Sequence, residues 1–140
     1  MFKRFFKRKI NTDAFTNLIA EGSTITGGMT FSGTLKVQGT IQGESGVHGA
    51  SANDPQVDED CLIVDKTGFV NAPSIKCADL VSAGTLEVQE IRCRGQIKLL
   101  KSTTIKDCTI YYNELEVELG ATIHNCRLIN MKMSDAASAE

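Results

Sequence analysis

The chain has 140 residues but no tryptophan, only two prolines and two histidines, and an aromatic content of 6%. No apolar stretch approaches the roughly 20 residues that a transmembrane helix requires. The basic N-terminus is not followed by the apolar region of a signal peptide. These absences predict a protein that stays in the cytoplasm, and the length suits one domain with a continuous core.

Closely spaced cysteine pairs are also missing, although the chain has five cysteines. Their separations are 16, 16, 15 and 18 residues, at Cys61, Cys77, Cys93, Cys108 and Cys126. A zinc site normally uses closely spaced ligand pairs, and a disulfide framework does not suit a chain without a secretory signal. We therefore expect reduced, buried thiols, no bound metal and no cofactor.

Positive charge is scarce outside the N-terminus, although the net charge is only −2. Five of the 15 basic residues precede the first acid, Asp13: Lys3, Arg4, Lys7, Arg8 and Lys9. The rest of the chain contains the other ten basic residues and all 17 acidic residues, so this body of the protein carries a net charge of −7. Such a body repels nucleic acid and acidic lipid, and any anionic partner must be held by the N-terminal residues. We expect no nucleic-acid partner.

The residues that are abundant indicate an all-β protein with internal repeats. Short runs of valine, isoleucine, leucine and threonine are bounded by turn residues, as in strands. A period near 17–18 residues relates Leu62, Leu80, Ile97 and Leu115. The motif Gly33-Thr-Leu-Lys-Val-Gln recurs as Gly84-Thr-Leu-Glu-Val-Gln. Such a repeat predicts a solenoid in which each coil stacks on the next.

A shorter period of six residues lies inside each repeat. A six-residue unit suits a short strand followed by a corner, and three such faces close a triangular coil. One turn of the coil then aligns the cysteines as an interior ladder of small side chains. The six-residue register slips across 44–61 and near Glu87. The apolar positions six apart are Ile19, Ile25, Phe31 and Val37, then Leu99, Ile105, Tyr111, Val117, Ile123 and Ile129.

The first slip coincides with a polar, acidic stretch, residues 44–61, that is rich in turn residues. This composition predicts a loop inserted between coils. Two interpretations remain open for it, a solvated excursion or a contact site.

Residues 18–43, from Leu18 to Gly43, resemble the opening segment of the bactofilins, which are bacterial cytoskeletal proteins. The later coils repeat its style to about Met133. The resemblance implies a right-handed parallel β-helix over 17–133, preceded by a tail over 1–16 and followed by a short tail over 134–140. It also implies nucleotide-independent assembly into nonpolar filaments that serve cell shape, wall synthesis, motility or protein positioning. Handedness follows from the resemblance alone, because left-handed β-helices share the six-residue unit.

The ends of such a solenoid are its weak points. Ordering the backbone costs roughly 1–2 kcal/mol per residue, and each buried apolar side chain returns about 1.5–3 kcal/mol. A terminal coil therefore needs a cover, and few residues are available as caps. We expect the ends to form a homopolymer junction at Leu18, Leu128, Ile129 and Met131. Val117 is expected to lie in the central core, where arginine would unfold the domain.

The N-terminal residues have the pattern of an interfacial membrane anchor. Phe2, Phe5 and Phe6 would share one side of a helix, with basic residues available to lipid headgroups. Met1–Lys9 also resembles the membrane-targeting segment of many bactofilins. The predicted membrane-binding residues are Phe2, Lys3, Arg4, Phe5, Phe6, Lys7, Arg8 and Lys9. They predict peripheral association with the inner face of the cell membrane; a disordered solubilising tail and an RNA-binding arm are the alternatives.

Two other functional classes were weighed against a cytoskeletal scaffold. An acyltransferase on a left-handed β-helix would use a histidine as general base. Only His48, expected in the loop, and His124, expected to face outward from a strand, are available, so we expect no catalytic residue. A monomeric adaptor would instead present one face of the solenoid to a partner, and cell-wall or morphogenesis proteins are the expected partners besides the protein itself.

Overall fold

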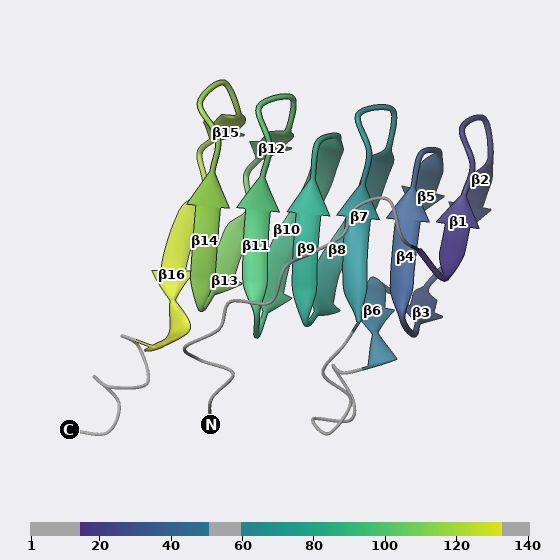
Figure 1. Cartoon of the computed structure of the whole chain (residues 1–140), viewed down its shortest axis with the longest axis horizontal. Helices are drawn as coiled ribbons and strands as arrows, with labels where there is room; N and C mark the ends of the chain where they lie inside the picture. The colour runs from purple at the N-terminus through teal and green to yellow at the C-terminus, as the bar shows by residue number, and fades with distance from the viewer. Residues whose placement is uncertain (1–14, 51–59, 133–140) are drawn as a thin grey trace.

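The computed structural model describes residues 15–50 and 60–132, which form sixteen β-strands (Figure 1). The strands are β1 (Asn17–Ile19), β2 (Thr24–Thr26), β3 (Met29–Phe31), β4 (Thr34–Val37), β5 (Thr40–Gln42), β6 (Val47–Gly49), β7 (Cys61–Val64), β8 (Phe69–Cys77), β9 (Asp79–Ser82), β10 (Thr85–Cys93), β11 (Gln96–Leu99), β12 (Thr104–Lys106), β13 (Thr109–Tyr112), β14 (Glu114–Val117), β15 (Thr122–His124) and β16 (Arg127–Asn130).

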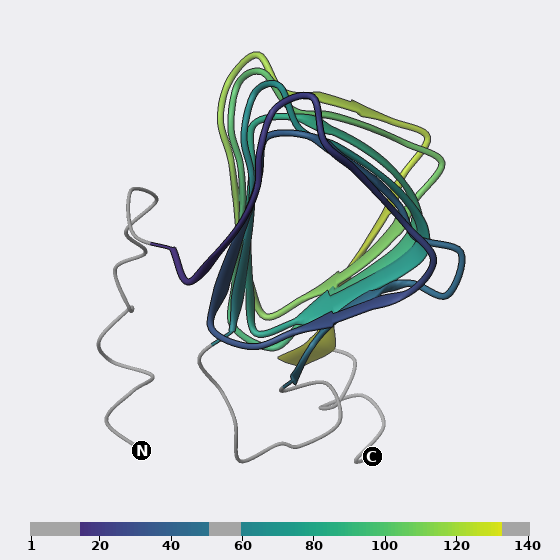
Figure 2. The ribbon, with the colours of Figure 1, turned by 90° about the vertical axis from the view of Figure 1, so that its right-hand side faces the viewer.

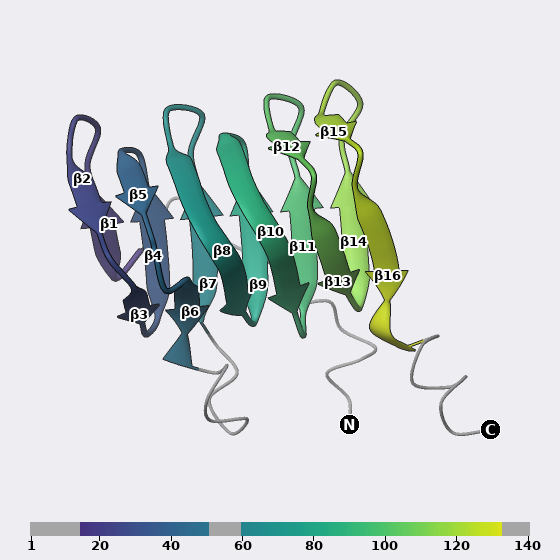
Figure 3. The same cartoon turned by 180° about the vertical axis from the view of Figure 1, so that it is seen from behind.

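All of these strands pair in parallel, each with strands of the coil before or after it. A six-stranded sheet, the front sheet, has the order β1-β4-β7-β9-β11-β14, with one strand from each of six coils. The other strands form the back of the coil (Figure 3), and the cross-section is triangular (Figure 2). In Figure 1 the front strands run upward, the chain crosses the top to the back, and each later coil lies farther left. This winding is right-handed, so the predicted right-handed parallel β-helix is confirmed.

The register confirms the period of 17–18 residues. Asn17 aligns with Leu35 and Cys61 with Asp79, each 18 positions later, whereas Leu80 and Ile97 are 17 apart. The corners after the front strands vary in length. Four residues turn the corner at 20–23, 65–68, 100–103 and 118–121, but two suffice at 38–39 and 83–84. The register slip near Glu87 follows from the short corner that precedes β10.

Glycine makes the two short corners possible. A Cβ at Gly39 would lie 2.4 Å from the carbonyl oxygens of Ala20 and Ser23. A Cβ at Gly84 would lie 2.4 Å from the carbonyl oxygens of Asp65 and Gly68. Real side chains do not tolerate such contacts, so each short corner packs glycine against the preceding coil.

The expected loop over 44–61 is wrong at both ends. Val47–Gly49 forms β6, which pairs with β3 and β8, and Cys61 begins β7. Residues 51–59 lie outside the described part of the chain. Because Val47 is the one apolar side chain that β6 contributes to the interior, the alternating pattern of a strand is hard to see there.

The core is a stack of apolar layers, one per coil. Leu35, Leu62, Leu80 and Ile97 align through the front sheet and are at most 1% exposed. The six-residue pattern assigns two late positions wrongly. Ile110 and Leu128 occupy the interior row, so their neighbours Tyr111 and Ile129, which align with each other, face outward.

The interior cysteine ladder is confirmed for four thiols and wrong for the fifth. Cys77 aligns with Cys93, and their sulfur atoms are 3.7 Å apart. Cys108 is buried in the same core and Cys126 packs against it. Cys61 instead faces outward in a separate cluster with Ile63, Val81 and Leu100. All five cysteines are thiols, and the described residues contain no group of three potential metal-ligating side chains.

Burial makes the interior thiols unreactive. A hydrogen bond with Cys93, followed by burial, raises the pKa of Cys77, and burial raises the pKa of Cys108 to about 12. We predict that at pH 8 the native protein exposes no reactive thiolate at Cys77, Cys93 or Cys108, because the raised pKa of Cys77 and of Cys108 leaves their reactive form scarce and Cys93 is fully buried. A colorimetric thiol assay should detect these three only after denaturation. Elemental analysis should find no zinc; one zinc per chain, lost on Cys77→Ser, would contradict this interpretation.

Candidate assembly surfaces at the ends of the coil

Each end of the described solenoid presents strand edges that pair on one side only. The front sheet ends in β1 and β14, and the back ends in β2 and β3 on one side and in β15 and β16 on the other. Unpaired N–H and C=O groups along parallel edges are a template for another chain. We define the N-end surface as the coil of β1–β3 and the C-end surface as the coil of β14–β16.

Large apolar side chains are exposed only in these two coils of the described chain. At the start they are Phe15, Leu18 and Ile25, and at the finish they are Val117, Leu119 and Leu128. Exposed apolar groups confined to two opposite ends of a molecule mark interaction sites. The pattern of exposure therefore favours contact at the ends over contact along the sides.

At the N-end surface, an interior side chain is more exposed to solvent than its partner in the next coil. Ile25 aligns with the fully buried Ile41 but is itself 36% exposed. Leu18 lies in the first coil, as expected for a junction residue, but it aligns with Lys36 and faces outward. Ile25 is therefore a candidate junction residue that the sequence reasoning missed, because its six-residue spacing from Ile19 had placed it in the core.

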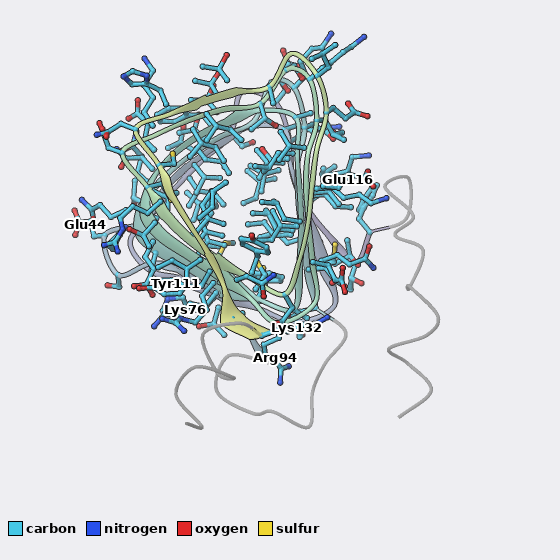
Figure 4. All side chains as sticks on the ribbon, turned by 90° about the vertical axis from the view of Figure 1, so that its left-hand side faces the viewer. Glu44, Lys76, Arg94, Tyr111, Glu116 and Lys132 are labelled. Carbon is cyan, nitrogen blue, oxygen red and sulfur yellow. The ribbon has the colours of Figure 1, made fainter. Side chains whose placement is uncertain are left out.

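At the C-end surface, Leu128 and Val117 continue interior rows that are fully buried one coil earlier. They align with Ile110 and Leu99, yet they are 47% and 44% exposed. The expectation that Val117 belongs to the central core is wrong, because Val117 lies in the last coil of the described residues and is exposed. In Figure 4, which looks onto this end, side chains fill the interior while Tyr111, Glu116 and Lys132 lie outside.

The two other residues expected at the junction lie on the side of the coil. Ile129 aligns with the outward-facing Tyr111, and an Arg92 guanidinium N–H donates to the sulfur of Met131 at 3.9 Å. The same guanidinium stacks 4.0 Å from the centroid of the Tyr111 ring. Ile129 and Met131 thus lie on the outer side of the last described coil, whereas Leu128 continues its interior row. The predicted membrane-binding residues, Phe2–Lys9, lie outside the described residues.

Two buried carboxylates tie neighbouring coils together, and the sequence reasoning did not single them out. Asp60 accepts a hydrogen bond from the Ala78 backbone N–H at 2.6 Å, and Asp79 accepts one from the Gln96 N–H at 2.8 Å. Both residues are nearly inaccessible to solvent. A carboxylate that binds the backbone of the next coil stiffens the corner. The recurrence of aspartate beside a front strand was the available signal.

The two histidines do not form a shared catalytic site. His48 lies in β6, contrary to the expected loop, and its Nε2 is 2.9 Å from the Ser74 hydroxyl. Burial, and then the charge of Lys76, lower the pKa of His48, so it is neutral near pH 7. His124 lies in β15, aligned with Lys106 and exposed as expected. Neither histidine lines either of two surface hollows, of about 440 and 370 Å³, that lie beside Asn71 and Gln89.

A stack of parallel coils whose terminal strands, among those described, pair on one side only and carry exposed apolar side chains defines a β-solenoid suited to self-association. The family model for bactofilin, described as polymer-forming cytoskeletal, matches residues 17–127. The chain therefore belongs to the bactofilin family and is a polymer-forming cytoskeletal protein. No curated protein and no solved structure gave a match. Among the described residues, no helix has the length and apolar character needed to cross a bilayer.

The C-end surface yields a direct test. We predict that Leu128→Arg and Val117→Arg each raise the protein concentration needed for polymerisation at least about tenfold, because removing about 1.4 kcal/mol from a junction changes its equilibrium tenfold. Sedimentation and electron microscopy measure assembly, and circular dichroism should report an intact β-fold.

Two controls frame this result. Leu99→Arg places the same charge one coil deeper, at a fully buried position, and should unfold the protein. Asn71 lies on the exposed side of a central coil, so the Asn71→Arg variant should polymerise normally. Filaments formed by Leu128→Arg and Val117→Arg at the wild-type concentration would exclude the C-end surface as a junction.

Proposed function

We propose that this protein polymerises end to end, without nucleotide, into filaments that its N-terminal residues hold against the inner face of the cell membrane. The confinement of exposed apolar side chains to the two terminal coils carries this proposal. A filament so anchored is a scaffold that positions wall-synthesis or morphogenesis proteins.

Nucleotide is unnecessary because the proposed junction uses the same contacts as the interior of the solenoid. A coil from a second chain would satisfy the strand edges, each hydrogen bond contributing about 0.5–1.5 kcal/mol. It would also cover side chains such as Ile25 and Leu128, with up to about 1.5–3 kcal/mol for each fully buried residue. These gains recur at every junction, so no hydrolysis step is needed to drive growth.

A nonpolar filament requires each end surface to bind its own kind. Like-end contacts are isologous, so one substitution is presented from both partners and its effect doubles. Ile25 and Leu128 lie on opposite ends of the solenoid and allow the two junctions to be blocked separately.

We predict that single-end variants of this nonpolar filament stop at dimers. Leu128→Arg should leave the N-end junction intact, and Ile25→Arg should leave the C-end junction intact, so analytical ultracentrifugation should find dimers in both. The double variant should be monomeric. Monomers from both single variants would show that the filament is instead built head to tail.

Membrane residence would depend on polymerisation. Each basic residue near an anionic surface contributes about 1 kcal/mol, and three partly inserted phenylalanines add a few more before ordering costs. One copy would bind weakly. A filament that displays many copies raises their effective concentration at the surface, so assembly and membrane binding strengthen each other.

Deleting residues 2–9 should separate the two properties. We predict that the deletion abolishes flotation with anionic vesicles but leaves polymerisation unchanged, because these residues precede every strand of the solenoid. Replacing Phe2, Phe5 and Phe6 by serine while keeping the basic residues should weaken flotation in part. Flotation of the deletion variant at the wild-type level would contradict the anchor.

A further inference from the structure

The outer side of the front sheet carries an apolar stripe that is covered. Cys61, Ile63 and Val81 face outward, yet they are 5%, 2% and 2% exposed. They pack with the half-buried Leu100 into a cluster separate from the interior core. We call these four residues the outer stripe.

An outward position does not by itself bury a side chain in this fold. On the back strands β5, β8, β10 and β12, one outward residue of each is exposed: Gln42, Asn71, Glu87 and Lys106. In the front sheet, by contrast, the outward residues Asp79 and Gln96 are also buried. The outer side of the front sheet is therefore less exposed to solvent than the outer side of the back strands.

The described chain begins on this same surface. Leu18, Lys36, Ile63 and Val81 form one outward row across β1, β4, β7 and β9. The Lys36 ammonium lies 5.5 Å from the centroid of the Phe15 ring, which places residue 15 beside the row. The segment that precedes Phe15 in the sequence therefore joins the described chain close to the outer stripe.

Length and composition indicate which segment covers the stripe. Residues 1–14 contain Phe2, Phe5, Phe6 and Ile10, whereas 51–59 and 133–140 contain no aromatic residue, leucine or isoleucine. Fourteen extended residues reach about 46 Å. From Lys36 to Val81 the row crosses two strand spacings, about 10 Å.

Charge complementarity points the same way. Beyond Val81 the outward row continues through the half-buried Lys98 to the exposed Glu116 in β14. The neighbouring Glu114 already accepts a hydrogen bond from the Lys132 ammonium at 3.0 Å. The N-terminal residues carry five basic side chains before Asp13, and an apolar stripe whose row ends at Glu116 suits a segment of phenylalanine and basic residues.

We infer that residues 1–14 dock on the outer stripe of their own solenoid and that anionic lipid draws them away. The docked segment hides its phenylalanines, and release exposes them together with the outer stripe. This inference rests on the proposed membrane role of the same residues. It adds an exchange between an intramolecular site and lipid.

Cys61 supplies the test, because it is the thiol of the outer stripe. In a Cys126→Ser background, the full chain should label slowly with a maleimide at Cys61, as read by mass spectrometry. Deleting residues 2–13 should raise the Cys61 rate at least about tenfold, equivalent to removing about 1.4 kcal/mol of cover. Cys77, Cys93 and Cys108 are the internal control, because they would react as well if the deletion unfolded the coil.

The remaining outcomes separate the alternatives. If deletion leaves the labelling rate of Cys61 unchanged, the docking is overturned. If the labelling rate of the full chain decreases as the protein concentration is raised, the cover is assigned to a second copy. Phosphatidylglycerol vesicles should accelerate Cys61 labelling of the full chain, whereas phosphatidylcholine vesicles should not; equal rates overturn lipid-driven release. Docking is measured without lipid, so a failed flotation test leaves its result unaffected.

Discussion

The structure depends on one constraint: no coil satisfies its own backbone, so every coil depends on the next. The strands are three to nine residues long, and each pairs in parallel with a strand one turn away. Hydrogen bonds and apolar layers are therefore shared between coils. The constraint produces regularity in the middle and incompleteness at both ends, because the first and last of the described coils pair on one side only.

The repeat could be recognised in the sequence because stacking aligns chemically similar residues. Leu62, Leu80 and Ile97 had to be apolar at one spacing, since each fills the same place in successive layers. The family resemblance supplied what spacing cannot, the right-handed winding. The exposed end of the described solenoid was predictable in part: Leu128 was expected near the end and is exposed there, but Val117 was assigned to the core because its own pattern does not reveal that its coil is the last one described.

The errors arose where the six-residue unit breaks. Corners of two and four residues shift the phase, and their length depends on whether a glycine such as Gly39 or Gly84 can approach the preceding coil. Asp107 and Asn125 adopt positive φ angles of 54° and 55° at another corner, and the Asn125 amide donates to Asp107 at 2.6 Å. After that corner the inward residues are Ile110 and Leu128 rather than Tyr111 and Ile129. Spacing alone cannot show such local conformations.

Cys61 illustrates a further limit and its consequence. Its spacing from Cys77 equals that of Cys77 from Cys93, yet Cys61 aligns with Asp79 and faces outward. Cys61 is nevertheless nearly inaccessible to solvent, and a cover drawn from the N-terminal residues would compete with lipid for the same phenylalanine side chains. In the docking proposed above, the membrane affinity of a single copy would be reduced in proportion to the fraction of time that the segment is released. A filament with many copies would need only a few released at once, so docking would suppress binding by single chains more strongly than binding by filaments.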